Sequence, residues 1–454
     1  MLRRGRDETP PSAASRKRGL QHAACLIGAL ALAALAPLEA AARGLIRDSE
    51  IERTLQRMLD PILTAAGESS DRVRLYVLND SSLNAFVSAG TNMVFHTGLI
   101  RELEAPEELI GVMAHEVGHV AARHYSRRVA AIEAAQDMNL LATIAGIGAG
   151  LAGGGGAGLG VAQGGSRIAT RQLLRATRGQ ELGADSLGVD YMNRIGVDPE
   201  AMFIVLRRLG ERIGPIAGIN PYAQTHPLTG RRIEALRQKV ATSPARGQRV
   251  SADMRYWHAR MRAKLDGFLS APGSSATVDY GDPELDLYRE AIALHRAPRP
   301  DAALDAVERL IAMRPQDPFY WELKGQILSE SGRGPQAVAP LEKAMRFAPD
   351  EPLIALALGD ALLTKRSPEA DARALPILER AAVGDRFNPG ILRSLADAYG
   401  RVGKEGMALL ATAERLAMIG RIPDAHRQAR FAQTKLPAGS PGWLRAEDVL
   451  NIKT

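Results

Sequence analysis

Cysteine is almost absent from this 454-residue chain, and the shortage limits the chemistry available to it. The one cysteine, Cys25, lies near the amino terminus. His22 stands three positions before it, where a lipoprotein signal needs a leucine-like residue, so lipidation is not expected. The chain beyond Cys25 has no thiol for a disulfide, for catalysis or for metal binding.

Aromatic residues are scarce as well, at 4% of the sequence, whereas alanine, leucine and arginine abound. This composition favours helices over β-sandwiches. With 46% hydrophobic and 24% charged residues the chain is globular, and its length is that of two or three domains. The formal net charge of +7 is partly carried by residues 1–42 and is otherwise scattered, so no nucleic-acid partner is expected.

The apolar run near the amino terminus, at 23–36, has fourteen residues and is too short for a comfortable bilayer crossing. A basic segment, 16–18, precedes it, and small residues up to Ala42 follow it. These three parts predict a secretory signal peptide over 1–42 that is cleaved near Ala42. An uncleaved amino-terminal anchor is the alternative.

Regular periodicity begins after this segment. Residues 49–66 have apolar positions at helical spacing, and 73–78 and 92–96 have the features of short strands. A further helix is expected to begin at Pro106. The glycine-rich segment 145–165 is interpreted as a flexible connection between helices, with a mobile lid or a membrane-contacting flap as the alternative.

The carboxy-terminal part of the chain repeats with a period of 34 residues. Pro315 and Pro349 are separated by this interval, and so are Gly325 and Gly359. A period of 34 is typical of tetratricopeptide repeats, which are pairs of helices. Their stacking creates a surface suited to binding a peptide or a protein.

The composition of 271–280, rich in proline, glycine, serine and alanine up to Thr277, indicates a linker. We therefore predict a globular domain over 43–270, this linker, and a tetratricopeptide-like helical repeat domain over 281–454.

The sequence His115-Glu116-Val117-Gly118-His119 lies in the helix expected after Pro106. Histidines four residues apart share one helix face and can offer nitrogen atoms to one metal ion. The glutamate between them can take a proton from a water molecule on that ion. The alternative is a buried helix whose histidines are only hydrogen-bonded. The motif by itself predicts a zinc site with hydrolytic chemistry.

A catalytic zinc ion keeps three protein ligands and one open position, so a third ligand is needed. The metzincin pattern is excluded because Tyr125 stands where that class has histidine, and His124 is expected on another side of the helix. Downstream, Glu181 and Asp185 share a helix face. We predict Glu181 as the third ligand and Asp185 as the carboxylate that orients a ligating histidine. A surface acidic pair is the alternative.

The dipeptide His226-Pro227 is the last element of the candidate site. Pro227 restricts His226 to an extended backbone. His226, or an arginine close behind it, is then placed to stabilise the oxyanion of a tetrahedral intermediate. Two alternatives remain open: His226 fills the open zinc position and holds the enzyme latent, or it is a structural turn residue.

These motifs resemble those of the BepA-like periplasmic zinc metalloproteases, in the peptidase family that includes HtpX and the CAAX-prenyl endopeptidase. The resemblance covers about 43–454 and rests on HEVGH, on Glu181–Asp185, on His226-Pro227 and on the segments 84–86, 90–92 and 96–99. It implies an α+β, mostly helical fold: a gluzincin-type metalloprotease domain with a small sheet, then an all-α tetratricopeptide solenoid.

The resemblance also implies roles for individual residues. His115, His119 and Glu181 would bind one zinc ion per chain, with Glu116 as the general base and Asp185 as the partner of a ligand. His226 and Arg232 would act on the transition state or as a switch, with Arg231 as the alternative to Arg232. The edge strand that pairs with an extended substrate would be Asn92, Met93, Val94, Phe95 and His96.

The implied function is an exported metalloendopeptidase of the periplasm that degrades misfolded or stalled envelope proteins, notably outer-membrane barrels. The repeat domain would dock these substrates, and it would also contact the outer-membrane protein assembly machinery. Association with the outer membrane and peripheral membrane contact through 145–165 fit this function. The alternative is a periplasmic assembly chaperone with a largely latent zinc site.

Overall fold

The structure is a computed structural model that describes residues 44–88, 91–124, 178–211, 226, 228–270 and 278–453. The predicted signal peptide and the glycine-rich segment 145–165 lie outside these residues, as does most of the predicted linker. Within the described ranges, none of the helices has both the length and the apolar character needed to cross a membrane.

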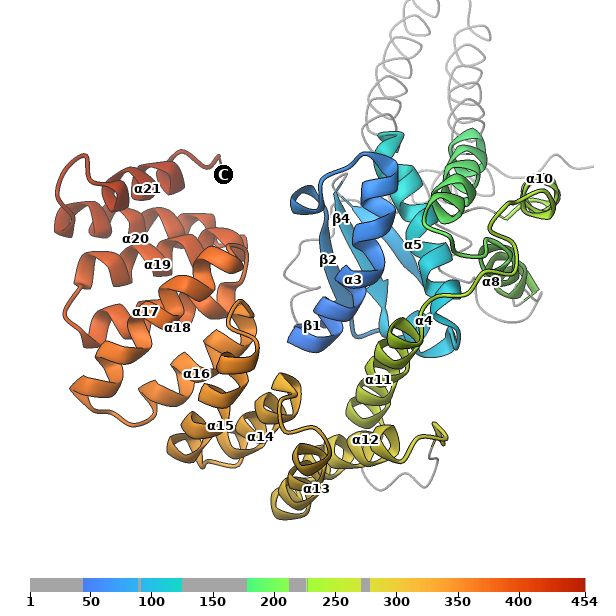
Figure 1. Cartoon of the computed structure of the whole chain (residues 1–454). Helices are drawn as coiled ribbons and strands as arrows, with labels where there is room; N and C mark the ends of the chain where they lie inside the picture. Colours follow the sequence, from blue (N-terminus) through green and yellow to red (C-terminus); the bar gives the residue numbers. More distant parts are fainter. Residues whose placement is uncertain are drawn as a thin grey trace, which may run out of the picture. The chain divides into compact units, whose positions relative to one another are not determined.

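A four-stranded mixed sheet lies at the centre of the amino-terminal part (Figure 1). Its strands are β1 (Leu45–Ile46), β2 (Arg74–Leu78), β3 (Ala85–Ser88) and β4 (Asn92–His96), in the order β1-β2-β4-β3. The pair β2–β4 is parallel and the other two pairs are antiparallel. The strands predicted from the sequence are β2 and β4, whereas β1 and β3 are too short to show an alternation.

The position of β4 corrects one prediction. Asn92, Met93, Val94, Phe95 and His96 do not form an edge strand, because β4 pairs with β2 on one side and with β3 on the other. Its backbone groups are used inside the sheet and are not available to an extended peptide. The edge strand on this side is β3, and within the described ranges no strand pairs with its outer edge.

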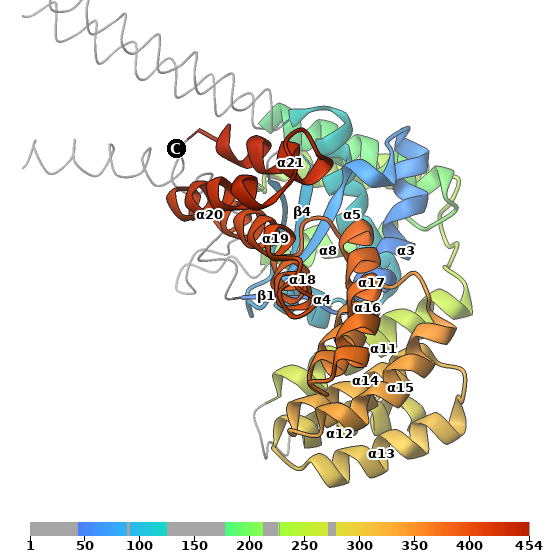
Figure 2. The ribbon, with the colours of Figure 1, turned by 90° about the vertical axis from the view of Figure 1, so that its left-hand side faces the viewer.

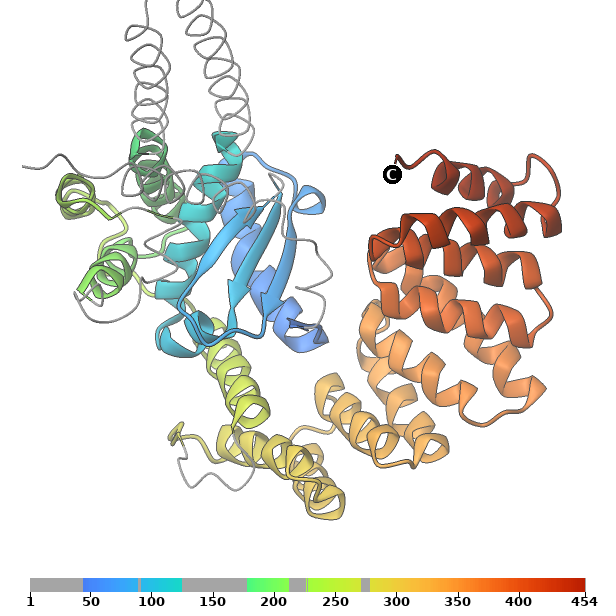
Figure 3. The same cartoon turned by 180° about the vertical axis from the view of Figure 1, so that it is seen from behind.

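Two long helices cover one face of the sheet, as Figure 3 shows from the opposite side. The first is α3 (Ser49–Ala66), which confirms the predicted helix. It begins at Asp48, whose carboxylate accepts hydrogen bonds from two backbone N–H groups, and ends at Gly67 in the left-handed region at φ 73°. The second long helix is α5 (Pro106–Ala121). Two short helices, η1 (Ser70–Arg72) and α4 (Thr97–Glu102), precede it in the chain.

The core between sheet and helices explains why these elements pack as they do. Val77, Phe95 and Ala85 form one row across three strands and are all buried. Leu59 of α3 and Val117 of α5 belong to the same apolar cluster. Burial of this row fixes which face of the sheet is covered, since the side chains of a strand alternate between its faces.

Helix α5 is buried along its length and also contacts α8 (Glu200–Glu211) and a helix over 178–194. The helix over 178–194 crosses α5 at Gly118. A Cβ atom on Gly118 would lie 2.8 Å from the carbonyl oxygen of Ala184, so only glycine permits this approach. Helix α10 (Gly230–Ala241) follows and packs on α8.

Beyond α11 (Ala252–Leu269) the chain consists of helices that pack on their neighbours in sequence, as expected of tetratricopeptide repeats (Figures 1 and 2). They are α12 (Pro283–Arg296), α13 (Pro300–Met313), α14 (Pro318–Glu330), α15 (Gly334–Phe347), α16 (Pro352–Leu363), α17 (Pro368–Gly384), α18 (Pro389–Arg401), α19 (Glu405–Met418), α20 (Ile422–Lys435) and α21 (Pro441–Leu450).

The repeated glycines have the same packing role in successive units. A Cβ atom on Gly325 of α14 would lie 2.5 Å from Cγ of Leu341 in α15. On Gly359 of α16 it would lie 2.5 Å from Cδ2 of Leu378 in α17. The missing side chain admits a leucine from the second helix of each pair, which is why these glycines keep one register.

Helix α11 contacts both α12 and the sheet-covering helix α3, so helical stacking begins before the predicted linker. Arg260 of α11 is fully buried and forms ion pairs with Glu50 of α3 and with Asp317 at the start of α14. Lys264 of α11 pairs with Asp48 and Glu50. A buried network of charges therefore connects the sheet-containing part to the first repeats.

Candidate metal centre

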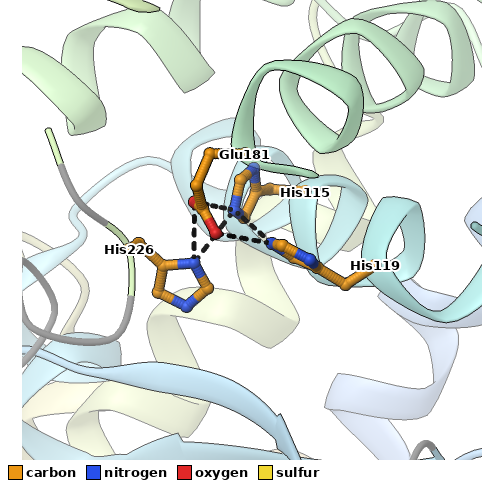
Figure 4. Close-up of side chains that lie close together, drawn as sticks. All are labelled: His115, His119, Glu181 and His226. Atoms are coloured by element: carbon orange, nitrogen blue, oxygen red, sulfur yellow. Dashed lines mark hydrogen bonds and ion pairs between the residues drawn. The ribbon is translucent and has the colours of Figure 1, made fainter. Parts of the chain in front are cut away.

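Four side chains from three parts of the chain converge beside the outer edge of β3. Helix α5 supplies His115 and His119, the helix over 178–194 supplies Glu181, and the segment before α10 supplies His226 (Figure 4). All four are buried, and one donor atom from each lies within 4.8 Å of the others.

The donor spacing of the first three fits one tetrahedral ion. His115 Nε2 lies 3.1 Å from His119 Nε2, and the two oxygens of Glu181 lie 3.5 Å and 3.4 Å from these nitrogens. Ligand atoms about 2.0 to 2.2 Å from a tetrahedral metal are about 3.3 to 3.6 Å apart. The predicted ligands are thus brought together at a spacing that suits a metal ion.

His226 stands at the fourth corner of this cluster. Its Nδ1 lies 3.2 Å from His115 Nε2 and 3.1 Å from Glu181 Oε2. Its Nε2 lies 3.3 Å from the carbonyl oxygen of Ala85 in β3. A proton on Nε2 donates to that carbonyl and leaves the lone pair of Nδ1 directed at the cluster. This arrangement matches the alternative in which His226 fills the open position of a metal.

Glu116 is fully buried beside the four donors. Neither of its carboxylate oxygens has a hydrogen-bond partner among the described residues, although His226 Nε2 lies within ion-pair distance, 3.3 Å from Oε1. Burial raises the pKa of Glu116 above its ordinary value, in spite of the nearby histidines. A buried acceptor without a donor is costly, so this carboxylate is suited to taking a proton from a water molecule placed there.

A second layer of charge supports the donors. Asp185 Oδ1 lies 2.9 Å from Nδ1 of His115, a distance at which a carboxylate can orient a ligating histidine. Arg232 donates to Asp185 Oδ1 over 2.9 Å, and its Nη1 is 2.9 Å from Glu181 Oε2. Arg232 lies in the first turn of α10, where Thr229 accepts a hydrogen bond from its backbone N–H.

The structure distinguishes the two arginines considered from the sequence. The Arg232 guanidinium is buried and is engaged by both carboxylates. Arg231 is exposed, and both arginines line a cavity of about 450 Å³ with Glu181. Of the two arginines, Arg232 is therefore the one that forms ion pairs with the carboxylates of the site.

Burial and charge set the protonation of the site without metal. Burial alone would lower the pKa of His115, but Asp185 and Glu181 outweigh it and raise this pKa to about 9. Burial lowers the pKa of His119 well below its ordinary value. For Glu181, burial opposes ionisation, yet the neighbouring rings of His226 and His115 outweigh it and hold the pKa well below the usual range.

Two neighbours of the site were not predicted from the sequence. Ala85 contributes its backbone carbonyl, which no side-chain pattern can indicate. His124 was expected on another side of the helix, but its Nδ1 lies 2.9 Å from Nδ1 of His119. Of the predicted substrate strand, His96 bonds to Ser82 over 2.8 Å instead of to the cluster.

Comparisons with known proteins agree with this geometry. Residues 46–240 match the family model described as peptidase family M48. A beta-barrel assembly-enhancing protease of Yersinia pestis is 29% identical over 95% of this chain and 92% of that protein. The protein of the same name from Escherichia coli K12 is 25% identical over 87% of this chain and 81% of that protein.

More distantly, the mitochondrial metalloendopeptidase OMA1 of Schizosaccharomyces pombe is 26% identical over 40% of this chain and 51% of that protein. All four residues of the buried histidine and carboxylate cluster lie within the matched region. The chain is therefore a metalloprotease, and its residues 46–240 match peptidase family M48.

Proposed function

We propose that this protein is an exported, zinc-dependent endopeptidase that cleaves misfolded or stalled outer-membrane proteins in the periplasm. The observation that carries the proposal is that donor atoms of His115, His119 and Glu181 have a spacing that suits one tetrahedral metal ion. Beside them lies the buried Glu116, whose carboxylate lacks a hydrogen-bond partner in the described structure. Two imidazoles and a carboxylate, with no thiolate, are a ligand set that catalytic zinc uses. The relatives named for β-barrel assembly support the substrate class.

Different residues of the site have different roles in the proposed hydrolysis. A zinc ion held by His115, His119 and Glu181 would supply a Lewis acid and lower the pKa of water. Glu116 takes the proton of the attacking water and delivers it to the leaving amine, a role suited to a carboxyl whose pKa burial has raised. Asp185 fixes the ring of His115, and Arg232 holds Asp185 and Glu181 in place.

The substrate strand pairs with β3 in this proposal. Strand β3 has an edge that pairs with no described strand, and its Ala85 carbonyl lies beside His226 and thus beside the donors. An extended peptide added at this edge is read through its backbone and so can vary in sequence. This suits a protease that acts on unfolded segments of many proteins.

The repeat domain docks the substrate or its assembly machinery. A cavity of about 610 Å³ between α17, α18 and α19 supports this role. Its lining includes Leu395, Met407 and Leu410, with Arg386 and Glu414 among them. Apolar side chains interspersed with charges suit a segment of an unfolded chain.

A second candidate function is a periplasmic assembly chaperone whose zinc site is largely latent. The position of His226 favours it, because an imidazole at the fourth corner blocks the place that a substrate carbonyl would take. In that case the repeat domain, and not hydrolysis, would supply the biological activity.

The substitution Glu116→Gln tests the two functions. It removes the base and keeps the ligands, so we expect the variant to fold and bind zinc but to cleave an unfolded envelope protein about 100- to 10,000-fold more slowly. Glu104→Gln, an exposed change just before α5, is the matched control. Wild-type cleavage by the Glu116 variant contradicts the proposed mechanism. Loss of cleavage with full rescue of an envelope-assembly defect supports the chaperone.

A further inference from the structure

The imidazole of His124 lies against the metal ligand His119, on the side away from the metal cluster. The Nδ1 atoms of the two rings are 2.9 Å apart, and the ring centroids are 5.0 Å apart at an angle of 73°. His119 presents its other nitrogen, Nε2, to His115 and Glu181. The two nitrogens of His119 therefore face two different partners.

The backbone after α5 brings His124 to this place. The helix ends at Ala121, and Arg123 takes the left-handed conformation at φ 52°, which is uncommon for a residue with a side chain. This turn redirects the chain, so His124 does not continue the helical spacing. The side chain of His124 is 5% exposed.

The helix that carries Glu181 lies close to the ring of His124. A Cβ atom on Gly183 would lie 3.8 Å from Cε1 of His124, which is ordinary van der Waals contact. His124 thus lies close to both elements that supply the proposed metal ligands, the end of α5 and the helix over 178–194.

The chemistry of a ligating histidine assigns a role to this contact. When Nε2 of His119 gives its lone pair to a metal, Nδ1 carries the proton and needs an acceptor. His115 has such a partner in Asp185, 2.9 Å from its Nδ1. For His119 the group at the same distance is Nδ1 of His124.

We propose that His124 is a positioning residue that accepts the Nδ1–H hydrogen bond of His119 and holds that ring in the tautomer and orientation that bind the metal. The inference rests on the proposed metal site formed by His115, His119 and Glu181. In this arrangement the ring of His124 carries its proton on Nε2. The partner of His119 is then a neutral imidazole, whereas the partner of His115 is the carboxylate of Asp185.

The test compares metal affinity in His124→Phe and His124→Asn. Phenylalanine keeps a ring but has no acceptor, so we expect the dissociation constant for Zn²⁺, measured by competition with a chromophoric chelator, to rise about 10- to 100-fold. Asparagine supplies an acceptor oxygen and is expected to recover most of the affinity. His96→Phe is the matched control, because His96 is equally buried in this domain but bonds to Ser82.

Wild-type affinity in His124→Phe overturns the proposal, and so does an equal loss in His124→Asn, which would mean that only packing is involved. A second measurement uses the unaltered protein, so it does not depend on the folding of a variant. In ¹⁵N-labelled, zinc-loaded protein, the nitrogen shifts should show His119 protonated at Nδ1 and His124 unprotonated at Nδ1. The opposite tautomer of His124 overturns the proposal, and absence of zinc binding by the wild-type protein overturns the proposed function with it.

Discussion

His226 is the residue whose position bears most directly on whether the site is open. Its Nδ1 lies within hydrogen-bonding distance of His115 and Glu181, and its Nε2 lies within hydrogen-bonding distance of the Ala85 carbonyl in the edge strand β3. A substrate that pairs with β3 would compete for both places. The side chain of His226 therefore connects the edge strand β3 with the fourth ligand position of the proposed metal site.

We expect His226→Ala to increase basal cleavage of an unfolded protein roughly tenfold, the change that follows if the closed arrangement is favoured by about 1.4 kcal/mol. Zinc content should stay the same, because three ligands remain. Steady-state kinetics with a fluorescent unfolded substrate provide the measurement. A fall in kcat would instead assign His226 the oxyanion-stabilising role.

The proton on His115 makes metal binding depend on pH. Burial opposes that proton, but Asp185 and Glu181 outweigh burial and raise the pKa of His115 to about 9 in the metal-free site. A raised pKa stabilises the metal-free fold fully below the unfolded value of about 6.5, and this stabilisation is lost as pH rises through 9.

Metal binding must displace this proton, so between pH 6.5 and 9 we expect the release of about one proton per metal ion. The apparent dissociation constant for the metal should then fall roughly tenfold for each unit by which the pH rises. Titration calorimetry at pH 7.5, in buffers of different ionisation enthalpy, measures the release. Asp185→Asn removes the main support of the proton and should shift the dependence to lower pH. No proton release from the wild-type protein at pH 7.5 would contradict the assignment.

At the scale of elements, the site depends on how closely α5 approaches the helix over 178–194. Gly118 lies between the ligand His119 and the core residue Val117, and it faces the backbone of Ala184. The ligands of α5 and the carboxylate of Glu181 meet only because these two helices are in contact at this glycine.

We expect Gly118→Ala to move the two helices apart and to destabilise the protein by about 1–3 kcal/mol, with weaker zinc binding. Gly179→Ala is the control, because a Cβ atom there meets nothing within 4 Å and alanine should stabilise the helix by about 0.5–1 kcal/mol. Urea unfolding and chelator competition measure both effects. Unchanged zinc affinity in Gly118→Ala would show that the ligands tolerate a shifted helix.

At the scale of the whole molecule, Arg260 connects the peptidase domain to the repeats. Its guanidinium is fully buried and pairs with Glu50 of α3 and Asp317 of α14. Removing Arg260 takes the buried guanidinium away from both carboxylates, although Glu50 keeps its ion pair with Lys264.

We expect Arg260→Met to cost about 3–5 kcal/mol, and to separate the unfolding of the peptidase domain from that of the repeats into two transitions. Arg333→Met, which removes a more exposed pair with Asp301, should cost no more than about 1 kcal/mol. Differential scanning calorimetry distinguishes the two variants. A single unshifted transition in Arg260→Met would mean that the network does not couple the domains.

The sequence by itself determined the features that depend on spacing within one element. His115 and His119 share a face because they are four residues apart in a helix, and the same holds for Glu181 and Asp185. The repeat register was readable because the same leucine contact recurs at Gly325 and Gly359 in consecutive helix pairs. Local geometry decides all of these, and it is the same wherever the helix packs.

Only the tertiary structure decided which elements meet. The order β1-β2-β4-β3 places β4 inside the sheet, because strand order follows from the packing of distant segments and not from alternation within a strand. Arg232 faces two carboxylates because α10 begins beside the helix over 178–194. His124 reaches His119 because the chain turns at Arg123, where helical spacing no longer applies.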